Sequence, residues 1–301
     1  MTAPTPEVSV IMPVWNGAKY LREAVQSILK QSFADFEFLI LDDGSTDETP
    51  RILEDFAGHD PRIRVIHLAH EGIVKALNRG VGEAKSEWIA RMDCDDIAHP
   101  ERLAKQTRAL KEAPKAVLCH TAVWQIGEPQ YMRKLQRLPR SQAMVAARLC
   151  YQSPIVHPTV VFSKEAFLRA GGYRAEERHA EDYGLWGRML NAGKFVGVNE
   201  PLLQFRVHGG SISKQKADVQ AALTTAIAQR HCAEFMGLSE SDARRAHGAI
   251  TEAKQENRLG EWLWFVGRCL PKLRWQSAEL WAWAVSQTIR RCVSSKIEAR
   301  S

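Results

Sequence analysis

Apolar residues in the first hundred positions form short unbroken runs that are separated by stretches with helical spacing. These runs are 8–14, which is rich in β-branched residues, 36–41, 63–68 and 88–92. Between the first two, Leu21, Ala24, Val25, Ile28 and Leu29 recur at the spacing of one helix face. This alternation predicts βαβ units and a parallel sheet. Because the strands are apolar almost throughout, we expect helices on both faces of that sheet.

The pattern becomes less regular after Pro100. A helix is expected to about Glu112 and an apolar stretch over 116–124. The later sequence predicts a strand over 154–162, a short helix over 164–170 and a turn at Gly171 and Gly172. It also predicts a helix over 182–191 and a hairpin or paired strands over 195–207. From about residue 217 only helical patterns remain. We therefore expect a catalytic domain over 1–215 and a helical region over 216–301.

Composition excludes few classes of protein. The chain has 301 residues, of which 45% are hydrophobic and 25% charged, with a formal net charge of +6. A mildly basic face suits diphosphates, anionic glycans or anionic lipid, but no Lys/Arg block argues for nucleic acid. None of the six cysteines forms a CxxC pair, which favours reduced thiols in a cytoplasmic protein. The N-terminus has no basic signal-peptide region, and no apolar run reaches the ~20 residues of a membrane span.

Two acidic loops carry most of the chemical information. Asp42 and Asp43 follow the second predicted strand, and Asp93 and Asp95 follow the fourth. Carboxylates at such strand ends lie at the edge where open α/β sheets bind ligands. The Asp-x-Asp spacing of the second loop offers hard oxygen ligands that suit Mg or Mn. The alternative for the first loop is an ordinary Asp-rich surface turn.

The end of the first predicted strand points to a nucleotide. Trp15 at this end can stack on a base while Asp43 accepts its N–H, although a core position for Trp15 is the alternative. Neither GxGxxG nor GxxxxGK[ST] is present, which disfavours a dinucleotide-binding domain and a P-loop.

Seven segments together resemble the glycosyltransferases of family 2, which have the GT-A fold. They are VSVIMPVWN, FEFLILDDGSTDET, ALNRGVGEAKSEWIARMDCDDIAHPERL, HPTVVF, GGYR, AEDYGLWGRM and FRVHGGSIS, in family order between residues 8 and 213. The resemblance implies an α/β fold with a GT-A-like, Rossmann-type mixed sheet flanked by helices and followed by a helical C-terminal extension. It also implies an inverting, metal-dependent hexosyltransferase that uses a nucleotide-diphosphate sugar.

The resemblance assigns residues to the donor and to the metal. Asp95 would ligate Mn or Mg as part of the DXD motif, and His208 would join it, a structural histidine being the alternative. Asp96 is either a capping residue or functional, and Gly209 and Gly210 would let their loop close over the donor. Where this chain has Trp15, the family more often has Tyr. The donor-binding residues would be Pro13, Trp15, Asp42, Asp43, Asn78, Arg79 and Asp93.

A second group of residues would serve the acceptor. Asp182 matches the general-base position, since a sugar hydroxyl must lose its proton during attack, and Glu181 precedes it. An ordinary acidic first helical turn is the alternative. Trp186 would form a platform for the acceptor sugar or belong to the core. His157 would pack on the acceptor side or be structural.

The sequence leaves the substrates partly open. UDP is the favoured nucleotide, with dTDP and GDP as alternatives, and a glycan or lipid-linked acceptor in surface polysaccharide or lipopolysaccharide assembly is expected. The rival functions are a nucleotidyltransferase and a non-catalytic sugar-nucleotide-binding or glycan-binding protein. From the composition of the C-terminal region we expect peripheral contact with the inner face of an anionic membrane. The alternative is that this region packs on the catalytic domain or on a second subunit. The region combines several basic residues with Trp262, Trp264, Trp275, Trp281 and Trp283.

Overall fold

The computed structural model describes residues 5–127, 135–136, 138–139, 141–208, 217–251, 259–273, 276 and 278–298. The chain divides into two compact units, one made of residues 1–138 and 155–216 and the other of residues 139–154 and 217–301. The second unit includes helix α5 (Gln142–Leu149), which the sequence assigns to the catalytic domain. Gly209 and Gly210 lie outside the described residues.

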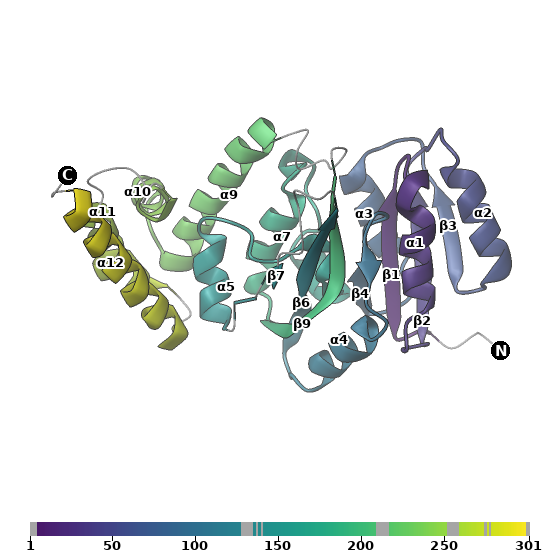
Figure 1. The fold of residues 1–301 in the computed structure, drawn as a ribbon, viewed down its shortest axis with the longest axis horizontal. Helices are drawn as coiled ribbons and strands as arrows, with labels where there is room; N and C mark the ends of the chain where they lie inside the picture. The colour runs from purple at the N-terminus through teal and green to yellow at the C-terminus, as the bar shows by residue number, and fades with distance from the viewer. Residues whose placement is uncertain are drawn as a thin grey trace. The chain divides into compact units, whose positions relative to one another are not determined.

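A mixed sheet of nine strands forms the first unit (Figure 1), as the resemblance predicts. The parallel part has the order β3-β2-β1-β4, and β4 then pairs antiparallel with β8. The order continues β6-β9-β5, with β7 paired to β6. The strands are β1 (Val8–Val14), β2 (Phe36–Asp42), β3 (Ile63–His67), β4 (Trp88–Arg91), β5 (Ile97–Ala98), β6 (Ala116–Gly127), β7 (Leu135–Gln136), β8 (Val161–Ser163) and β9 (Lys194–Val207).

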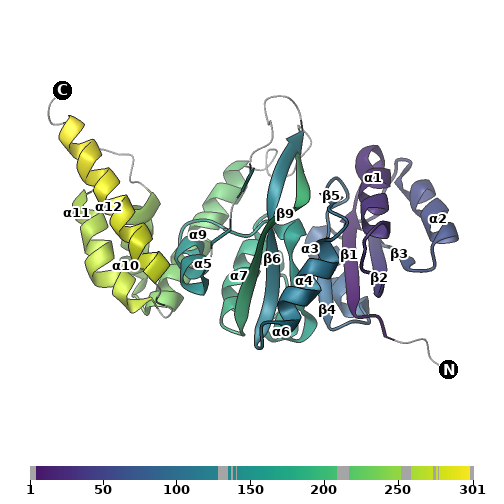
Figure 2. The same cartoon turned by 60° about the horizontal axis from the view of Figure 1, so that its bottom comes forward.

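Helices cover both faces of this sheet, which explains why β1 and β2 are buried at every position. On one face, α1 (Ala18–Leu29), α2 (Thr49–His59) and α4 (Arg102–Lys111) share a core with alternate residues of the strands. On the other face, α3 (Ile73–Glu83) approaches closely at Gly80, where a Cβ atom would lie 3.0 Å from Leu41. Figure 2 shows α4 lying across β6 and β9. The unit also contains α6 (Lys164–Arg169) and α7 (Glu181–Leu190).

Two expectations about the later strands are wrong. Residues 154–160 do not extend β8, because His157–Thr159 forms a 3-10 turn in which Thr159 N–H donates to Val156 C=O at 3.0 Å. Residues 195–207 form no hairpin, since β9 is one strand that pairs along β6 with register shifts between Thr121 and Val123. These irregularities, near Pro201, let a single strand show the broken pattern that resembles two.

The regular secondary structure in the described part of the second unit is all helical. It contains α5, α9 (Ala217–Met236), α10 (Glu240–Thr251), α11 (Leu259–Trp264) and α12 (Ala278–Glu298). Trp262 is fully buried and donates from Nε1 to Thr288 at 2.8 Å, and Trp283 packs edge-on against it. These two rings therefore serve the core of the unit. Trp275 lies outside the described residues.

Two further features follow from the described residues. Among them, no helix is both long enough and apolar enough to cross a bilayer. The cysteines at 94, 119, 150, 232 and 269 are free thiols.

A buried ion pair fixes helix α7. Arg188 donates to both carboxylate oxygens of Glu177 at 2.9 and 2.8 Å and to the carbonyls of Ala170 and Gly172. Glu177 is 1% exposed. A Cβ atom at Gly184 would lie 2.2 Å from this carboxylate. Glycine at 184 is therefore needed for space.

Gly184→Ala should destabilise the fold by roughly 1–3 kcal/mol, because the new methyl group displaces the buried Glu177 carboxylate. Urea denaturation measures the change. Gly82→Ala is the matched control, since Gly82 also lies in a helix and a Cβ there meets nothing within 4 Å. This control should keep or raise stability. Equal stability of the Gly184 variant and wild type would show that Glu177 and Arg188 can move aside.

Candidate functional site

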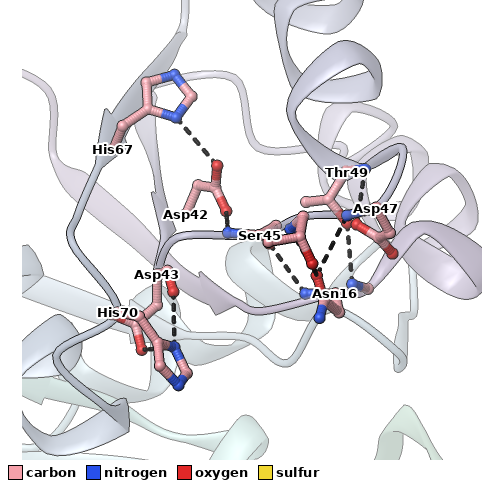
Figure 3. Close-up of polar contacts among 10 residues, drawn as sticks. Asn16, Asp42, Asp43, Ser45, Asp47, Thr49, His67 and His70 are labelled. Atoms are coloured by element: carbon pink, nitrogen blue, oxygen red, sulfur yellow. Dashed lines mark hydrogen bonds and ion pairs between the residues drawn. The ribbon is translucent and has the colours of Figure 1, made fainter.

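The loop after β2 is held against the end of β1 by a dense set of hydrogen bonds (Figure 3). Asn16 donates from its backbone to Ser45 Oγ at 2.9 Å and accepts at Oδ1 from Thr46 N–H at 2.8 Å. Gly17 N–H donates to Thr49 Oγ1 at 2.9 Å. Asn16 has a positive φ of 49°, which asparagine tolerates better than most residues. The loop is thus prearranged at the carboxyl edge of the parallel strands.

Asp42 and Asp43 are both buried in this loop, and both shape it. Asp42 accepts from Ser45 N–H at 3.1 Å and contacts His67 Nδ1 at 3.0 Å. The two oxygens of Asp43 accept from Glu71 N–H at 2.7 Å and from Gly72 N–H at 2.9 Å. Each carboxylate oxygen can accept a second hydrogen bond, so Asp43 keeps capacity for a base N–H.

Trp15 is an open aromatic surface beside Asp43. It is 54% exposed, and its ring stacks on His70 with centroids 4.6 Å apart. His70 Nδ1 contacts the carbonyl of Asp43 at 3.0 Å, which fixes the histidine ring. The expectation of a core position for Trp15 is therefore wrong, and a base could stack on its free surface.

The remaining predicted donor residues have other contacts in the structure. Asn78 uses both ends of its amide on the backbone of Tyr173, at 2.8 and 3.1 Å, and so holds the turn before α7. Arg79 is exposed and pairs with Glu83 at 2.8 Å. Pro13 is buried within β1. Their roles toward a donor stay predictions.

The acidic loop after β4 gathers three carboxylates. Ligand oxygens of Asp93, Asp95 and Asp96 lie within 4.8 Å of one another. His208 comes from the end of β9, 113 residues further along the chain, and its Nε2 lies 3.0 Å from Asp95 Oδ2. Arg206 Nε donates to the Asp95 carbonyl at 2.7 Å. Asp95 and His208, predicted as metal ligands, are therefore side by side.

Two carboxyl groups of this loop have raised pKa values because they are buried. Burial raises the pKa of Asp93, against the opposing effect of the Arg91 guanidinium that pairs with it. Burial and the neighbouring Asp93 raise the pKa of Asp96 well above its usual value. Asp96 Oδ2 is buried without a hydrogen-bond partner among the described residues. A bound cation would supply both the missing partner and the missing positive charge.

Asp182 lies at the start of α7, in its first turn. It is half-buried, and Oδ1 accepts from Tyr183 N–H at 2.8 Å. Burial, followed by the charge of Glu181, raises the pKa of Asp182 to about 7. Glu181 is buried and accepts from His179 N–H at 2.6 Å, and burial also raises its pKa. A carboxylate that titrates near neutrality is suited to proton transfer.

Two predicted acceptor residues belong to the interior. Trp186 is fully buried, so it forms core and not an open platform. His157 packs edge-on against it with ring centroids 5.7 Å apart. His157 Nε2 and Tyr173 Oη are 2.7 Å apart, and burial lowers the pKa of His157 well below its usual value. A neutral, structural His157 follows from this environment.

Three residues near the site were not singled out from the sequence. Nothing in the sequence around His70 indicates a functional role, except that it lies three residues after His67. Arg91 stands inside an apolar strand, and a lone arginine there could have been recognised as a partner for the following aspartates. Arg206 lies two residues before His208, inside the segment FRVHGGSIS. Its contact with Asp95 depends on tertiary structure.

Comparison of the sequence with known proteins gives a matching family model and a related enzyme. The family model described as glycosyl transferase family 2 matches residues 9–170. The O-antigen biosynthesis glycosyltransferase WbnJ of Escherichia coli is 31% identical over 232 residues, which cover 76% of this chain and 86% of that protein.

Solved structures share the fold at low sequence identity. Staphylococcus aureus TarS 1–349 in complex with UDP-GlcNAc has a TM-score of 0.63 at 19% identity, covering 98% of this chain and 91% of that one. Mannosyltransferase PcManGT from Pyrobaculum calidifontis, in complex with GDP-Man and Mn2+, has a TM-score of 0.56 at 16% identity. It covers 97% of this chain and 87% of that one.

Proposed function

The chain belongs to glycosyl transferase family 2 and is a glycosyltransferase, and we propose that it is an inverting, metal-dependent one. It would move a sugar from a nucleotide-diphosphate donor to an acceptor hydroxyl. One observation carries the proposal above all. Three carboxylates converge within 4.8 Å and meet a histidine that comes from the far end of the domain. The relative WbnJ, described as an O-antigen biosynthesis enzyme, supports a role in surface polysaccharide or lipopolysaccharide assembly.

The nucleotide would lie against the loop after β2. Trp15 offers a ring that is 54% exposed, and Asp43 lies at the same strand edge. Stacking on the indole and one hydrogen bond from the base to Asp43 would select a base with an N–H donor, as in uracil. Thymine and guanine also carry such a donor, so dTDP and GDP stay alternatives, and the TarS complex with UDP-GlcNAc supports UDP as the favoured nucleotide. Asp93 would contact the ribose or the sugar.

A divalent metal fits the acidic loop. Carboxylate oxygens with one imidazole nitrogen suit Mn or Mg, and the unpartnered Asp96 Oδ2 offers a further buried oxygen among the described residues. Asp95 and His208 would hold the ion. When bound, it would neutralise charge on the leaving diphosphate.

Asp182 would act as general base. It would accept the proton of the acceptor hydroxyl while that oxygen attacks the anomeric carbon from the face opposite the diphosphate. The new C–O bond forms as the bond to the diphosphate oxygen breaks, so the configuration inverts. A nucleotidyltransferase would have no use for this base. The product released from a nucleotide sugar separates the candidate functions. A glycosyltransferase releases nucleoside diphosphate, a nucleotidyltransferase is marked by pyrophosphate, and a non-catalytic binding protein releases no product.

Asp95→Asn should weaken Mn-dependent donor binding by about 100-fold or more, because a charged ligand is replaced by a neutral one. Calorimetry with UDP-sugars, with and without Mn, measures the effect. Asp55→Asn is the matched control on an exposed helix position and should bind as wild type does. Unchanged metal-dependent affinity in the Asp95 variant would remove this residue from the metal site.

Asp182→Asn should keep donor affinity and lower sugar transfer by ~100-fold or more. Asp182 is protonated below its pKa of about 7 and charged above it. In wild type, kcat/KM should therefore rise as the pH increases through about 7, and the variant should lose this limb. Glu176→Gln, at an exposed position, is the control. A variant with the same pH profile as wild type would place the base elsewhere.

Exposed apolar side chains of the second unit could bring the enzyme to the inner face of a membrane with a lipid-linked acceptor. Trp281 is 38% and Val285 56% exposed, and they lie four residues apart, on one face of α12. Arg268 and Lys272 are exposed on the preceding segment. Such side chains suit an anionic headgroup layer.

The double variant Trp281→Ala, Val285→Ser should lose co-sedimentation with anionic vesicles at low salt, where wild type is expected to sediment. Val219→Ser, at another exposed position, is the matched control, and neutral vesicles test the role of charge. Wild-type protein that stays in the supernatant with anionic vesicles would rule out the membrane contact.

A further inference from the structure

The first unit has a groove outside the candidate site. It has a volume of about 550 Å³ and lies between the start of α4 and the strands β6 and β9. This volume is within the range of small-molecule sites, roughly 300–1,000 Å³. None of the residues assigned above to donor, metal or base lines it. A ligand bound in the groove would therefore leave those residues free.

One wall of the groove is an aromatic surface. Trp124 is 37% exposed and lies beside Pro201 and Leu202. A large indole that is left open beside a hollow is unusual for plain core, because its burial would contribute to stability. An indole face with a polar N–H at its edge suits a ligand that is apolar on one side and polar on the other.

The charged residues that line the groove carry a net negative charge. Lys105 Nζ lies 3.0 Å from Glu101 and 2.7 Å from Glu200, so two carboxylates share one ammonium group. The remaining charge disfavours phosphates, nucleotides and anionic lipids. Carboxylate oxygens and the Gln204 amide are instead partners for hydroxyl groups.

The groove is connected to the acidic loop through β9. Gln204 pairs with Trp124 and Arg206 with Ile126 in regular register. Side chains two residues apart share one face of a strand and are about 7 Å apart along it. The Arg206 side chain on this face donates to the Asp95 carbonyl at 2.7 Å. A chain of sugars in the groove would therefore follow the same strand face toward the reaction centre.

We propose that this groove binds a neutral segment of the acceptor glycan, with a pyranose ring stacked on Trp124 and its hydroxyls on Glu101, Glu200 and Gln204. The inference rests on the proposed function in naming the ligand as the acceptor. The segment bound here lies away from the hydroxyl that reacts. The groove thus selects longer acceptors by their internal sugars.

Binding of the full chain to a printed array of neutral and sulfated oligosaccharides, two to six sugars long, tests the proposal without donor. Wild type should bind neutral members. Trp124→Ala should weaken that binding by at least about tenfold, as expected for loss of a central aromatic anchor. Trp124→Tyr should restore most of it. Leu168→Ala, at a residue that is 60% exposed, is the matched control.

Other outcomes separate the possible failures. Equal binding by wild type and Trp124→Ala, binding of sulfated members only, or no binding of neutral glycans at millimolar concentration would each overturn the proposal. Donor affinity and UDP release from UDP-sugars are measured on the same variants and should be unchanged. If wild-type protein releases no UDP from UDP-sugars, this would instead contradict the proposed function, whatever the array shows.

Discussion

A fully buried arginine on α4 ties together the elements that carry the acidic site. Arg102 donates to the carbonyls of Arg91 at 2.8 Å and Val160 at 3.4 Å, and to Gln106 at 3.0 Å. Gln106 in turn donates to the carbonyls of Thr159 and Cys119. Burial lowers the pKa of Arg102 to about 10, so it stays charged at neutral pH. A buried charge is costly unless its donors are satisfied, and here the bonds fix the strand end from which the acidic loop starts.

Helix α7, whose first turn carries the proposed base Asp182, also depends on an arginine. Arg188 lies in the last turn of α7, pairs with Glu177 and donates to the carbonyls of Ala170 and Gly172. A planar guanidinium presents its N–H donors in a rigid fork, so one arginine fixes the directions of several acceptors. The strand end before the acidic loop is therefore held by an arginine of α4, and the helix that carries Asp182 is held by an arginine of its own last turn. Rigid support of this kind is what a site needs if its charges are to be in place before substrate binds.

The sequence predicted well what depends on local pattern. The run 8–14 is β1, and the acidic pairs fall at the ends of β2 and β4, because buried parallel strands have a strong apolar signal. The sequence did not decide cases in which one pattern fits two different tertiary arrangements. The periodicity of α7 does not tell whether Trp186 faces the core or a substrate, and β9 resembled a hairpin because it changes register. The closeness of His208 to Asp95 followed from family resemblance and not from spacing.

Burial raises pKa values both in the acidic loop and at Asp182. The neighbouring charges differ between these two places. Burial raises the pKa values of Asp93 and Asp96, which lie beside Asp95, so a divalent cation held by Asp95 and His208, as proposed, would favour the charged forms of both. After burial, the charge of Glu181 raises the pKa of Asp182, and the charge of Arg91 opposes this to a smaller extent. With a pKa of about 7, Asp182 can take up a proton at neutral pH. The proposed roles, metal binding at the acidic loop and proton transfer at Asp182, thus fit the different environments of the two groups.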